Sequence, residues 1–293
     1  SLTLKDGRKV SYDLLVIASG NEPNYYGHDD WKKVTVPLKT LKDAVKLRNK
    51  ILVTFEKAEN QKKQTNQDKF LRFVIVGGGP TGVELAGAIS EIAFTTFKNN
   101  FRNINLDRSE IYLIEAAPRI LGEYPKPLSH KARKYLENFG VKVISNAKIN
   151  NISKGLIELE DRKIESEVII WAAGNKISTY ITESDIPLDS KTKRVSVKKD
   201  MSLLDDDNIF VVGDVASYPT KDGRGLPAIA PVAIQQGAYL AKLLNARLKD
   251  KKISEFRYYD KGSLATIGKA KAVGLIFGYS VSGFFAWLIW SVI

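Results

Sequence analysis

The chain has 293 residues, a net charge of +12 and no cysteine. Without thiols it cannot hold disulfides, iron–sulfur clusters or thiolate zinc sites, or pass electrons through a cysteine pair. With two histidines we expect no metal site. The length suits about two domains, and the positive charge favours an acidic partner such as an anionic membrane surface. The lysines are dispersed and no nucleic-acid motif accompanies them, so we expect no nucleic-acid partner.

The first 70 residues predict short strands followed by one long helix. Residues 1–10 read as a hairpin that turns at Asp6-Gly7. Residues 12–20 predict a buried strand ending in the small residues IASG, an opening typical of a chain that begins inside a fold. Residues 38–60 carry apolar side chains at helical spacing, and the polar run 61–69 reads as a linker.

The most informative stretch is FVIVGGGPTGVELAG, at residues 73–87. Strand-forming residues lead into a G-x-G-x-x-G turn, and a helical pattern follows at once. The first glycine allows the sharp turn, the second lets the backbone approach a pyrophosphate, and the third lets helix and strand pack closely. The helix N-terminus then offers N–H groups to the phosphates. This pattern predicts a dinucleotide site formed by Gly77, Gly79, Pro80, Thr81 and Gly82.

A second strand of the same unit is predicted at residues 111–115, and it ends in Glu115. A carboxylate at that position accepts ribose hydroxyls and repels a 2′-phosphate, which favours NADH over NADPH. Arg119 lies close enough along the chain to accept a 2′-phosphate instead. A strand-end surface charge is the other interpretation of Glu115.

The remaining elements predict a parallel, doubly wound sheet. A helix at 127–138, a strand at 141–144, hairpin strands within 149–165 and a buried strand ending in WAAG at 171–174 follow in order. The endings IASG and WAAG bracket the glycine-loop unit, which therefore reads as a domain inserted into another. We expect four parts: part of an outer domain with linker helix at 1–68, the nucleotide domain at 69–174, the rest of the outer domain at 175–260, and a C-terminal segment at 261–293.

The run NIFVVGDVA at residues 208–216 predicts a buried strand ending in Gly213-Asp214. Asp214 would then lie where α/β sheets bind ligands, and it either accepts hydroxyls of a sugar or ribityl chain or caps the next helix. That helix opens near Ala230. It carries Gln235 and Gln236, of which one is expected to face a ligand and the other the solvent.

The last 22 residues carry no charge and are rich in aromatic side chains. Their length would reach across a bilayer, but three glycines predict a strand-turn segment followed by an apolar helix from about Ser282. Aromatic residues beside small ones favour an interfacial anchor. A buried packing helix is the alternative.

In chain order, the motifs IASG, GGGPTGVELAG, EAAPRIL, WAAG, FVVGDVA, APVAIQQG and DKGSLATIGKAKAVG with SGFFAWLIW resemble type II NADH:quinone oxidoreductases. These belong to the flavoproteins with two dinucleotide-binding domains, and the resemblance covers essentially the whole chain. It implies two Rossmann-like domains, with the NADH domain inserted into an incomplete FAD domain. It also implies FAD and NADH as cofactors, a membrane quinone as electron acceptor, and a peripheral place on the cytoplasmic face of the cell membrane, with a homodimer as one assembly.

The resemblance also assigns roles to individual residues. Glu84 corresponds to a family glutamate near the contact between nicotinamide and flavin, and Gln235 and Gln236 lie near the flavin ring and quinone pocket. These three form the expected catalytic set. The expected cofactor-binding set adds to the glycine loop and Glu115 the residues Ala173, Gly174, Gly213, Asp214, Val232 and Ala233.

Three departures from the family pattern qualify these expectations. The flavin-binding glycine loop, which precedes residue 1 in the family, is absent from this sequence, so we expect weak flavin binding. The sequence ends within the expected anchor, and Pro231 stands where relatives often have glutamine. Two alternatives stay open: a soluble reductase that docks a small acidic redox protein on its basic surface, and a module that binds NADH without turnover.

Overall fold

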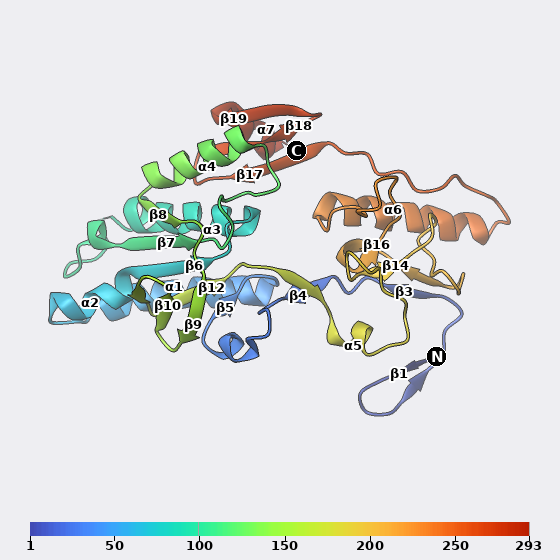
Figure 1. Cartoon of the computed structure of the whole chain (residues 1–293), viewed down its shortest axis with the longest axis horizontal. Coiled ribbons are helices and arrows are strands. Elements are labelled where there is room, and N and C mark those ends of the chain that lie inside the picture. The colour runs from blue at the N-terminus through green and yellow to red at the C-terminus, as the bar shows by residue number, and fades with distance from the viewer. Residues whose placement is uncertain (99, 293) are drawn as a thin grey trace. The chain divides into compact units, whose positions relative to one another are not determined.

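The computed structural model describes residues 1–98 and 100–292. It forms two compact units of mixed α/β structure (Figure 1). The smaller unit comprises residues 1–22 and 175–259, and the larger unit comprises residues 23–174 and the chain from 260 onward. The chain leaves the smaller unit after IASG and returns to it after WAAG, so the predicted α/β fold with one unit inserted into another is confirmed. The structure groups residues 23–68 and the C-terminal segment with the glycine loop, whereas the sequence interpretation had placed them apart from it.

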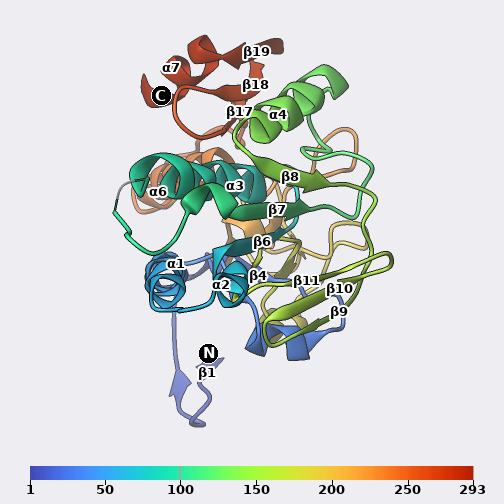
Figure 2. The same ribbon diagram turned by 90° about the vertical axis from the view of Figure 1, so that its left-hand side faces the viewer.

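The larger unit is built on a five-stranded parallel sheet with the strand order β5-β12-β6-β7-β8 (Figure 2). Its strands are β5 (Val36–Pro37), β6 (Arg72–Val76), β7 (Glu110–Ile114), β8 (Val141–Ile144) and β12 (Val168–Trp171), and an antiparallel sheet of β9 (Ile149–Ser153), β10 (Leu156–Leu159) and β11 (Lys163–Glu165) packs beside it. Successive side chains of a strand point to opposite faces. Phe73 and Ile75 join the core under the helices, whereas Val74 and Val76 pack with the antiparallel sheet. Both faces are therefore covered, which is why these strands are apolar throughout.

Helices cover one face of this sheet (Figure 2). They are α1 (Leu41–Glu59), α2 (Gln64–Leu71), α3 (Pro80–Glu91), the π-helix η2 (Ile92–Thr96), the 3-10 helix η3 (Leu106–Arg108) and α4 (Lys126–Asn138). The 3-10 helix η1 (Asp29–Lys33) lies on the other face, where its Trp31 packs with Val74 and Val76. Helix α1 begins after a capping box, in which Thr40 Oγ1 accepts the N–H of Asp43 at 3.1 Å and the Asp43 carboxylate accepts the N–H of Thr40 at 2.9 Å. The polar run expected to be a linker is helical in α2 instead. Buried Gln67 holds it there by donating to the carbonyls of Gln61 and Asn103.

The C-terminal segment packs on α3. It consists of the antiparallel strands β17 (Gly262–Thr266), β18 (Ala272–Ile276) and β19 (Tyr279–Gly283), followed by the helix α7 (Phe284–Val292), so the predicted strand-turn and apolar helix are confirmed. A Cβ atom on Gly87 of α3 would lie 2.5 Å from the backbone nitrogen of Gly268. Only glycine allows this approach. Among the described residues, no helix is long and apolar enough to cross a bilayer.

The smaller unit contains short parallel strand pairs beside one long helix. Its elements are β1 (Leu2–Thr3), β2 (Lys9–Val10), β3 (Leu15–Ile17), β4 (Asn21–Pro23, which runs on into the larger unit), β13 (Asn175–Ile177), α5 (Thr179–Thr182), β14 (Val195–Ser196), β15 (Ile209–Val211), η4 (Gly213–Val215), β16 (Ala216–Ser217) and α6 (Ala230–Arg247). The hairpin at Asp6-Gly7 forms as predicted. The strand expected to be buried is not: β3 pairs only with β15 in a two-stranded sheet, and Val16 stays 44% exposed.

Replacing Gly87 with alanine tests the contact between α3 and β17. The added methyl group meets backbone at Gly268, and overpacking of this kind costs about 1–3 kcal/mol, which outweighs the gain of about 1 kcal/mol from helix propensity. We expect faster amide hydrogen exchange in β17 and β18. The matched control is Gly237→Ala in α6, where nothing lies within 4 Å and a gain of roughly 0.5–1 kcal/mol is expected. Equal stabilisation by both substitutions would show that α3 and β17 have room between them.

Candidate nucleotide and flavin site

The glycine loop at the end of β6 has the geometry that its sequence predicts. Gly77 has a φ of +108°, and a Cβ atom there would lie 2.7 Å from the carbonyl carbon of Ala172. A Cβ atom on Gly82 would lie 1.8 Å from the carbonyl oxygen of Gly77. Nothing lies within 4 Å of the corresponding position on Gly79, so the loop is open where a pyrophosphate would approach. Helix α3 starts at Pro80 without a side-chain cap, which leaves its first-turn N–H groups for a ligand.

Glu115 follows β7 and turns back toward the glycine loop. One carboxylate oxygen accepts the N–H of Gly78 at 2.6 Å, and the other accepts the N–H of Ala117 at 2.7 Å. Each oxygen keeps a further lone pair for a ligand hydroxyl. A strand-end charge that merely faced the solvent would not be fixed in this way, so the geometry favours the ribose-binding interpretation.

The guanidinium of Arg119 donates hydrogen bonds to backbone carbonyl groups. It donates to the carbonyl oxygens of Leu121 at 3.2 Å, Tyr124 at 2.7 Å and Gly122. These bonds hold the loop that follows Glu115. They leave the arginine poorly placed for a 2′-phosphate, which was the alternative raised by the sequence.

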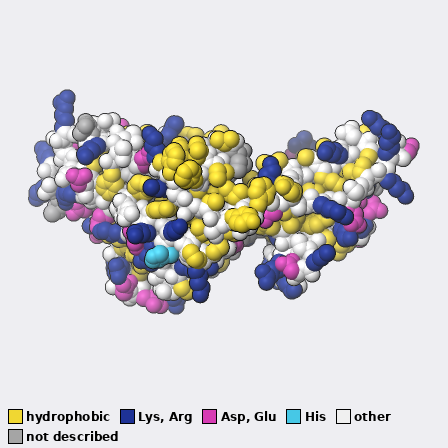
Figure 3. Space-filling view, turned by 90° about the horizontal axis from the view of Figure 1, so that it is seen from above, with side chains coloured by type: hydrophobic (Ala, Val, Ile, Leu, Met, Phe, Trp, Pro, Cys, Tyr) yellow, Lys and Arg dark blue, Asp and Glu magenta, His cyan; other side chains and the backbone are white. Residues whose placement is uncertain are grey.

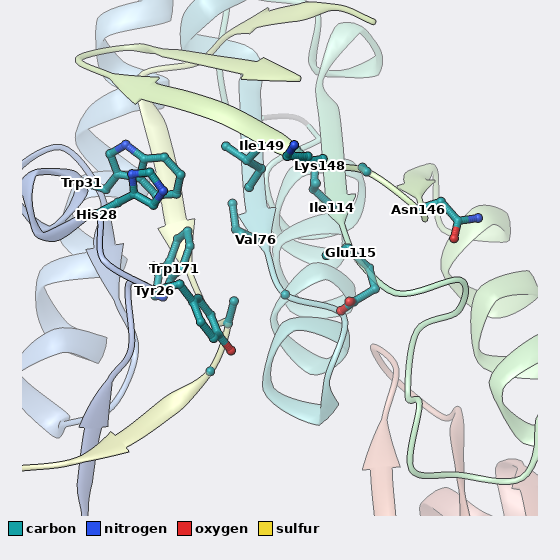
Figure 4. Close-up of a pocket in the computed structure, with 15 residues that line it drawn as sticks. Tyr26, His28, Trp31, Val76, Ile114, Glu115, Asn146, Lys148, Ile149 and Trp171 are labelled. Atoms are coloured by element: carbon teal, nitrogen blue, oxygen red, sulfur yellow. The ribbon is translucent and has the colours of Figure 1, made fainter. Parts of the chain in front are cut away.

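A cavity of about 560 Å³ opens at this edge of the sheet, and we call it the edge pocket (Figure 4). Gly77, Glu115, Ala173 and Gly174 line it, so it joins four of the residues predicted for cofactor binding. Its other lining residues, which sequence reasoning missed, are Tyr26, His28, Trp31, Val76, Ile114, Ala116, Asn146, Ala147, Lys148, Ile149 and Trp171. Tyr26, His28 and Trp31 come from the segment before α1, whereas Trp171 lies at the end of β12. Of these, only Trp171, inside the WAAG motif, gave any signal in the sequence.

Glu84 lies on α3 beside the C-terminal strand β17. Its carboxylate oxygen accepts the N–H of Thr266 at 3.3 Å. Burial raises the pKa of Glu84, and the Thr266 hydrogen bond offsets this only in part. Tyr124 shares this environment: burial raises its pKa, a hydrogen bond with Ser263 opposes the rise, and the charge of Glu84 adds to it. The C-terminal segment therefore sets the surroundings of this carboxyl group.

In the smaller unit, Gly213 and Asp214 lie at the carboxyl end of β15. Gly213 has a φ of +78° and donates its N–H to Gln236 Oε1 at 2.6 Å. Asp214 is half-buried, and its charge acts on Arg194, whose pKa burial lowers while Asp189 and Asp214 oppose the shift. Helix α6 begins after Ile229, whose side chain makes no cap hydrogen bond.

The two adjacent glutamines of α6 both bond to the backbone. Gln236 is only 1% exposed and fixes Gly213. Gln235 pairs both ends of its amide with Tyr259, donating to the carbonyl at 3.0 Å and accepting the N–H at 2.9 Å. Neither side chain faces the solvent freely, contrary to the expectation for one of them. Val232 is buried, and Ala233 packs beside Gly213.

Substituting Glu84 with glutamine should stabilise the larger unit in a pH-dependent way. In the folded protein the pKa of Glu84 lies above the ordinary value of 4.5. The wild-type protein therefore loses stability as the pH rises through the pKa of the folded state, while the Glu84→Gln variant, which has no proton to lose there, does not. We expect equal melting temperatures below about pH 4 and a higher one for the variant at about pH 7. Thermal unfolding across this range checks it, with exposed Glu56→Gln as control. A difference that does not change with pH would contradict the buried carboxylate.

Comparison with known proteins agrees with this geometry. Residues 1–237 match the profile of the pyridine nucleotide-disulphide oxidoreductases. The type II NADH:quinone oxidoreductase Ndh of Mycobacterium tuberculosis is 36% identical over 297 residues, which cover 97% of this chain and 63% of the relative. The type II NADH:quinone oxidoreductase of Staphylococcus saprophyticus is 30% identical, with 95% and 69% covered. This chain thus spans about three fifths of the length of the mycobacterial relatives.

A solved structure shares the fold. NDH2 from Plasmodium falciparum, in complex with NADH, superimposes with a TM-score of 0.88 over 98% of this chain and 75% of its own, at 22% identity. The likeness at that identity concerns the fold alone. The matched profile and the staphylococcal relative place the chain in the pyridine nucleotide-disulphide oxidoreductase family, among the type II NADH:quinone oxidoreductases.

Proposed function

We propose that this chain binds NADH and FAD as part of a type II NADH:quinone oxidoreductase, which reduces a membrane quinone without pumping protons. The observation that carries the proposal is the bond between Glu115 and the glycine loop. It joins the two elements that a dinucleotide spans, namely the phosphate cradle and the ribose acceptor. The relatives are named for the same reaction, which supports the assignment.

NADH rather than NADPH is the expected nucleotide. The Glu115 carboxylate lies where a 2′-phosphate would bring a second negative charge. Arg119, the nearby cation that would balance that second charge, is held by three backbone carbonyls. The site therefore offers a hydroxyl acceptor and no free guanidinium beside it.

The smaller unit fits one end of FAD. After β15, the Asp214 carboxylate would accept hydrogen bonds from the hydroxyls of the ribityl chain, with Gly213 beside it. Val232 and Ala233 at the start of α6 would lie along the flavin. The residues present do not include a pyrophosphate cradle for FAD, because the single G-x-G-x-x-G sequence belongs to the larger unit. When bound, FAD supplies the two-electron chemistry between NADH and quinone.

The chain's own residues would orient the reactants and hold protons. Glu84, fixed by the N–H of Thr266 and with a raised pKa, can carry a proton closer to neutral pH than an exposed glutamate. It would orient the nicotinamide or exchange a proton near it. Gln236 would act indirectly, since its amide fixes the backbone of Gly213.

The C-terminal segment supports a peripheral place on a membrane, against anionic lipids. We propose the cytoplasmic face of the cell membrane, as the family resemblance implies. Helix α7 buries only Ala286, while Phe285 is 76% exposed and Val292 is 81% exposed. Hydrophobic side chains gather on this face with Lys and Arg around them (Figure 3). Apolar side chains ringed by cations match the interface of an anionic bilayer.

Reduction of a soluble quinone analogue tests the function. In the full-length natural protein loaded with FAD, NADH should drive reduction with a kcat/KM at least about tenfold above that of NADPH. Glu115→Gln should raise the KM for NADH about tenfold with little change in kcat, since a hydrogen bond to a charged group contributes about 1.5–3 kcal/mol. Steady-state kinetics checks both values.

Exposed Glu165→Gln, on strand β11 of the antiparallel sheet, is the control and should leave the kinetics unchanged. Bound flavin that accepts no electrons from NADH would overturn the proposed activity. Binding of NADH without turnover would favour the non-enzymatic module.

Substituting Phe285 and Trp290 with serine tests the membrane surface. Burial of one large apolar side chain contributes roughly 1.5–3 kcal/mol, so each change should weaken binding to anionic phospholipid vesicles about tenfold. Co-sedimentation with vesicles measures it. Leu41→Ser is the matched control, because Leu41 on α1 is 82% exposed but lies outside the C-terminal segment. Equal losses for all three variants would contradict a role for α7 in particular.

A further inference from the structure

Tyr26 occupies a tight turn that disfavours a tyrosine. The N–H of His28 bonds to the carbonyl of Tyr25 at 3.0 Å. The two central residues, Tyr26 and Gly27, have φ values of 52° and 91°. Positive φ at both positions defines a type I′ turn, which normally takes asparagine, aspartate or glycine. Asn24 fixes the conformation, because its side-chain oxygen accepts the N–H of Tyr26 at 2.9 Å.

The ring of Tyr26 is exposed and lies at the carboxyl end of β12. It is 63% exposed and lines the edge pocket together with Gly77 and Glu115. Figure 4 shows its hydroxyl pointing away from Trp31 and His28. A Cβ atom on Gly174 would lie 2.2 Å from that hydroxyl oxygen. The tyrosine therefore covers the glycine that ends the WAAG motif.

The order of the strands in the sheet indicates which half of a bound dinucleotide would lie next to Tyr26. Glu115 follows β7, on one side of β6 and its glycine loop, and Gly174 follows β12, on the other side. In a doubly wound sheet the dinucleotide crosses at this switch point, with the adenosine half beside the acidic residue. The nicotinamide half then lies toward β12, where Tyr26 stands.

We propose that Tyr26 is a binding residue that packs its ring against the nicotinamide half of NADH and holds it over the end of β12. This rests on the proposed function. Aromatic rings stack favourably on flat heterocycles, and unfavourable backbone conformations persist where surrounding structure fixes them, often at ligand sites. The ring of Tyr26 is exposed and lines the pocket at the proposed nucleotide site, so it is available for stacking. Its backbone also has a disfavoured conformation that the surrounding structure fixes.

The test compares two ligands that differ by the nicotinamide half. NAD⁺ is the first probe, since it cannot donate a hydride to the flavin, and ADP-ribose is the second, since it lacks the nicotinamide. In the flavin-loaded full-length protein, Tyr26→Asn should weaken NAD⁺ binding about tenfold and change ADP-ribose binding less than about twofold. Calorimetric titration measures both. The melting temperature should stay equal or rise, because asparagine suits the left-handed conformation.

Three further variants separate the possible outcomes. Tyr26→Phe keeps the ring and should keep NAD⁺ affinity. Tyr279→Asn is the control, since Tyr279 is 78% exposed on β19, and Glu115→Ala should weaken both ligands. Unchanged NAD⁺ binding in Tyr26→Asn, or an equal loss of both ligands, overturns this inference while the proposed function stands. Failure of the wild-type protein to bind either ligand overturns both.

Discussion

The turn at Gly77 is the constraint on which the site depends. Strands β6 and β12 run side by side in parallel register up to Val76 and Trp171. Immediately afterwards the chain must leave the sheet through a gap in which a side chain on Gly77 would strike the backbone of Ala172. This turn aims the start of α3 at the sheet edge. It also brings Gly78 within reach of the Glu115 carboxylate, and it opens the space that Gly174 and Tyr26 border.

Helix α3 connects this edge to the C-terminal segment. Its first turn faces the glycine loop, its next turn carries Glu84 against Thr266, and a turn further on Gly87 touches the backbone at Gly268. A glycine inside a helix costs about 1 kcal/mol relative to alanine, so close packing must compensate for it here. The same docking removes Glu84 from water and raises its pKa. The protonation of a residue beside the proposed nicotinamide site therefore depends on a strand that comes late in the sequence.

The sequence is most informative where the constraint is local. The glycine loop and Glu115 could be predicted because a strand, a turn and a helix N-terminus dictate residue types over a few positions. The place of Tyr26 in the site could not be predicted. It depends on a contact with Gly174, far along the chain, and on a positive φ angle that tyrosine rarely adopts. The polar run of α2 predicted a linker because the residue that anchors the helix cannot be identified from its neighbours in the sequence. That residue is Gln67, which donates hydrogen bonds to the carbonyl groups of Gln61 and of distant Asn103. The bond between Gln236 and the N–H of Gly213 could not be predicted either, because it joins residues of different elements.

The exposed helix α7 follows directly on strands that are anchored in the core. Exposing apolar side chains to water is unfavourable by about 25 cal/mol per Å², and α7 leaves most of its side chains outside the core. The strands before it are anchored in the core through Ala265 of β17, Val273 of β18 and Ile267, which follows β17. One continuous segment thus packs against the helix of the glycine loop at its start and presents an apolar surface at its end. Lys131 of α4 bonds to Ser282 at 2.9 Å, which ties that surface to the nucleotide-binding unit as well. The same short stretch of chain thus sets the surroundings of Glu84 and carries the exposed apolar surface of α7.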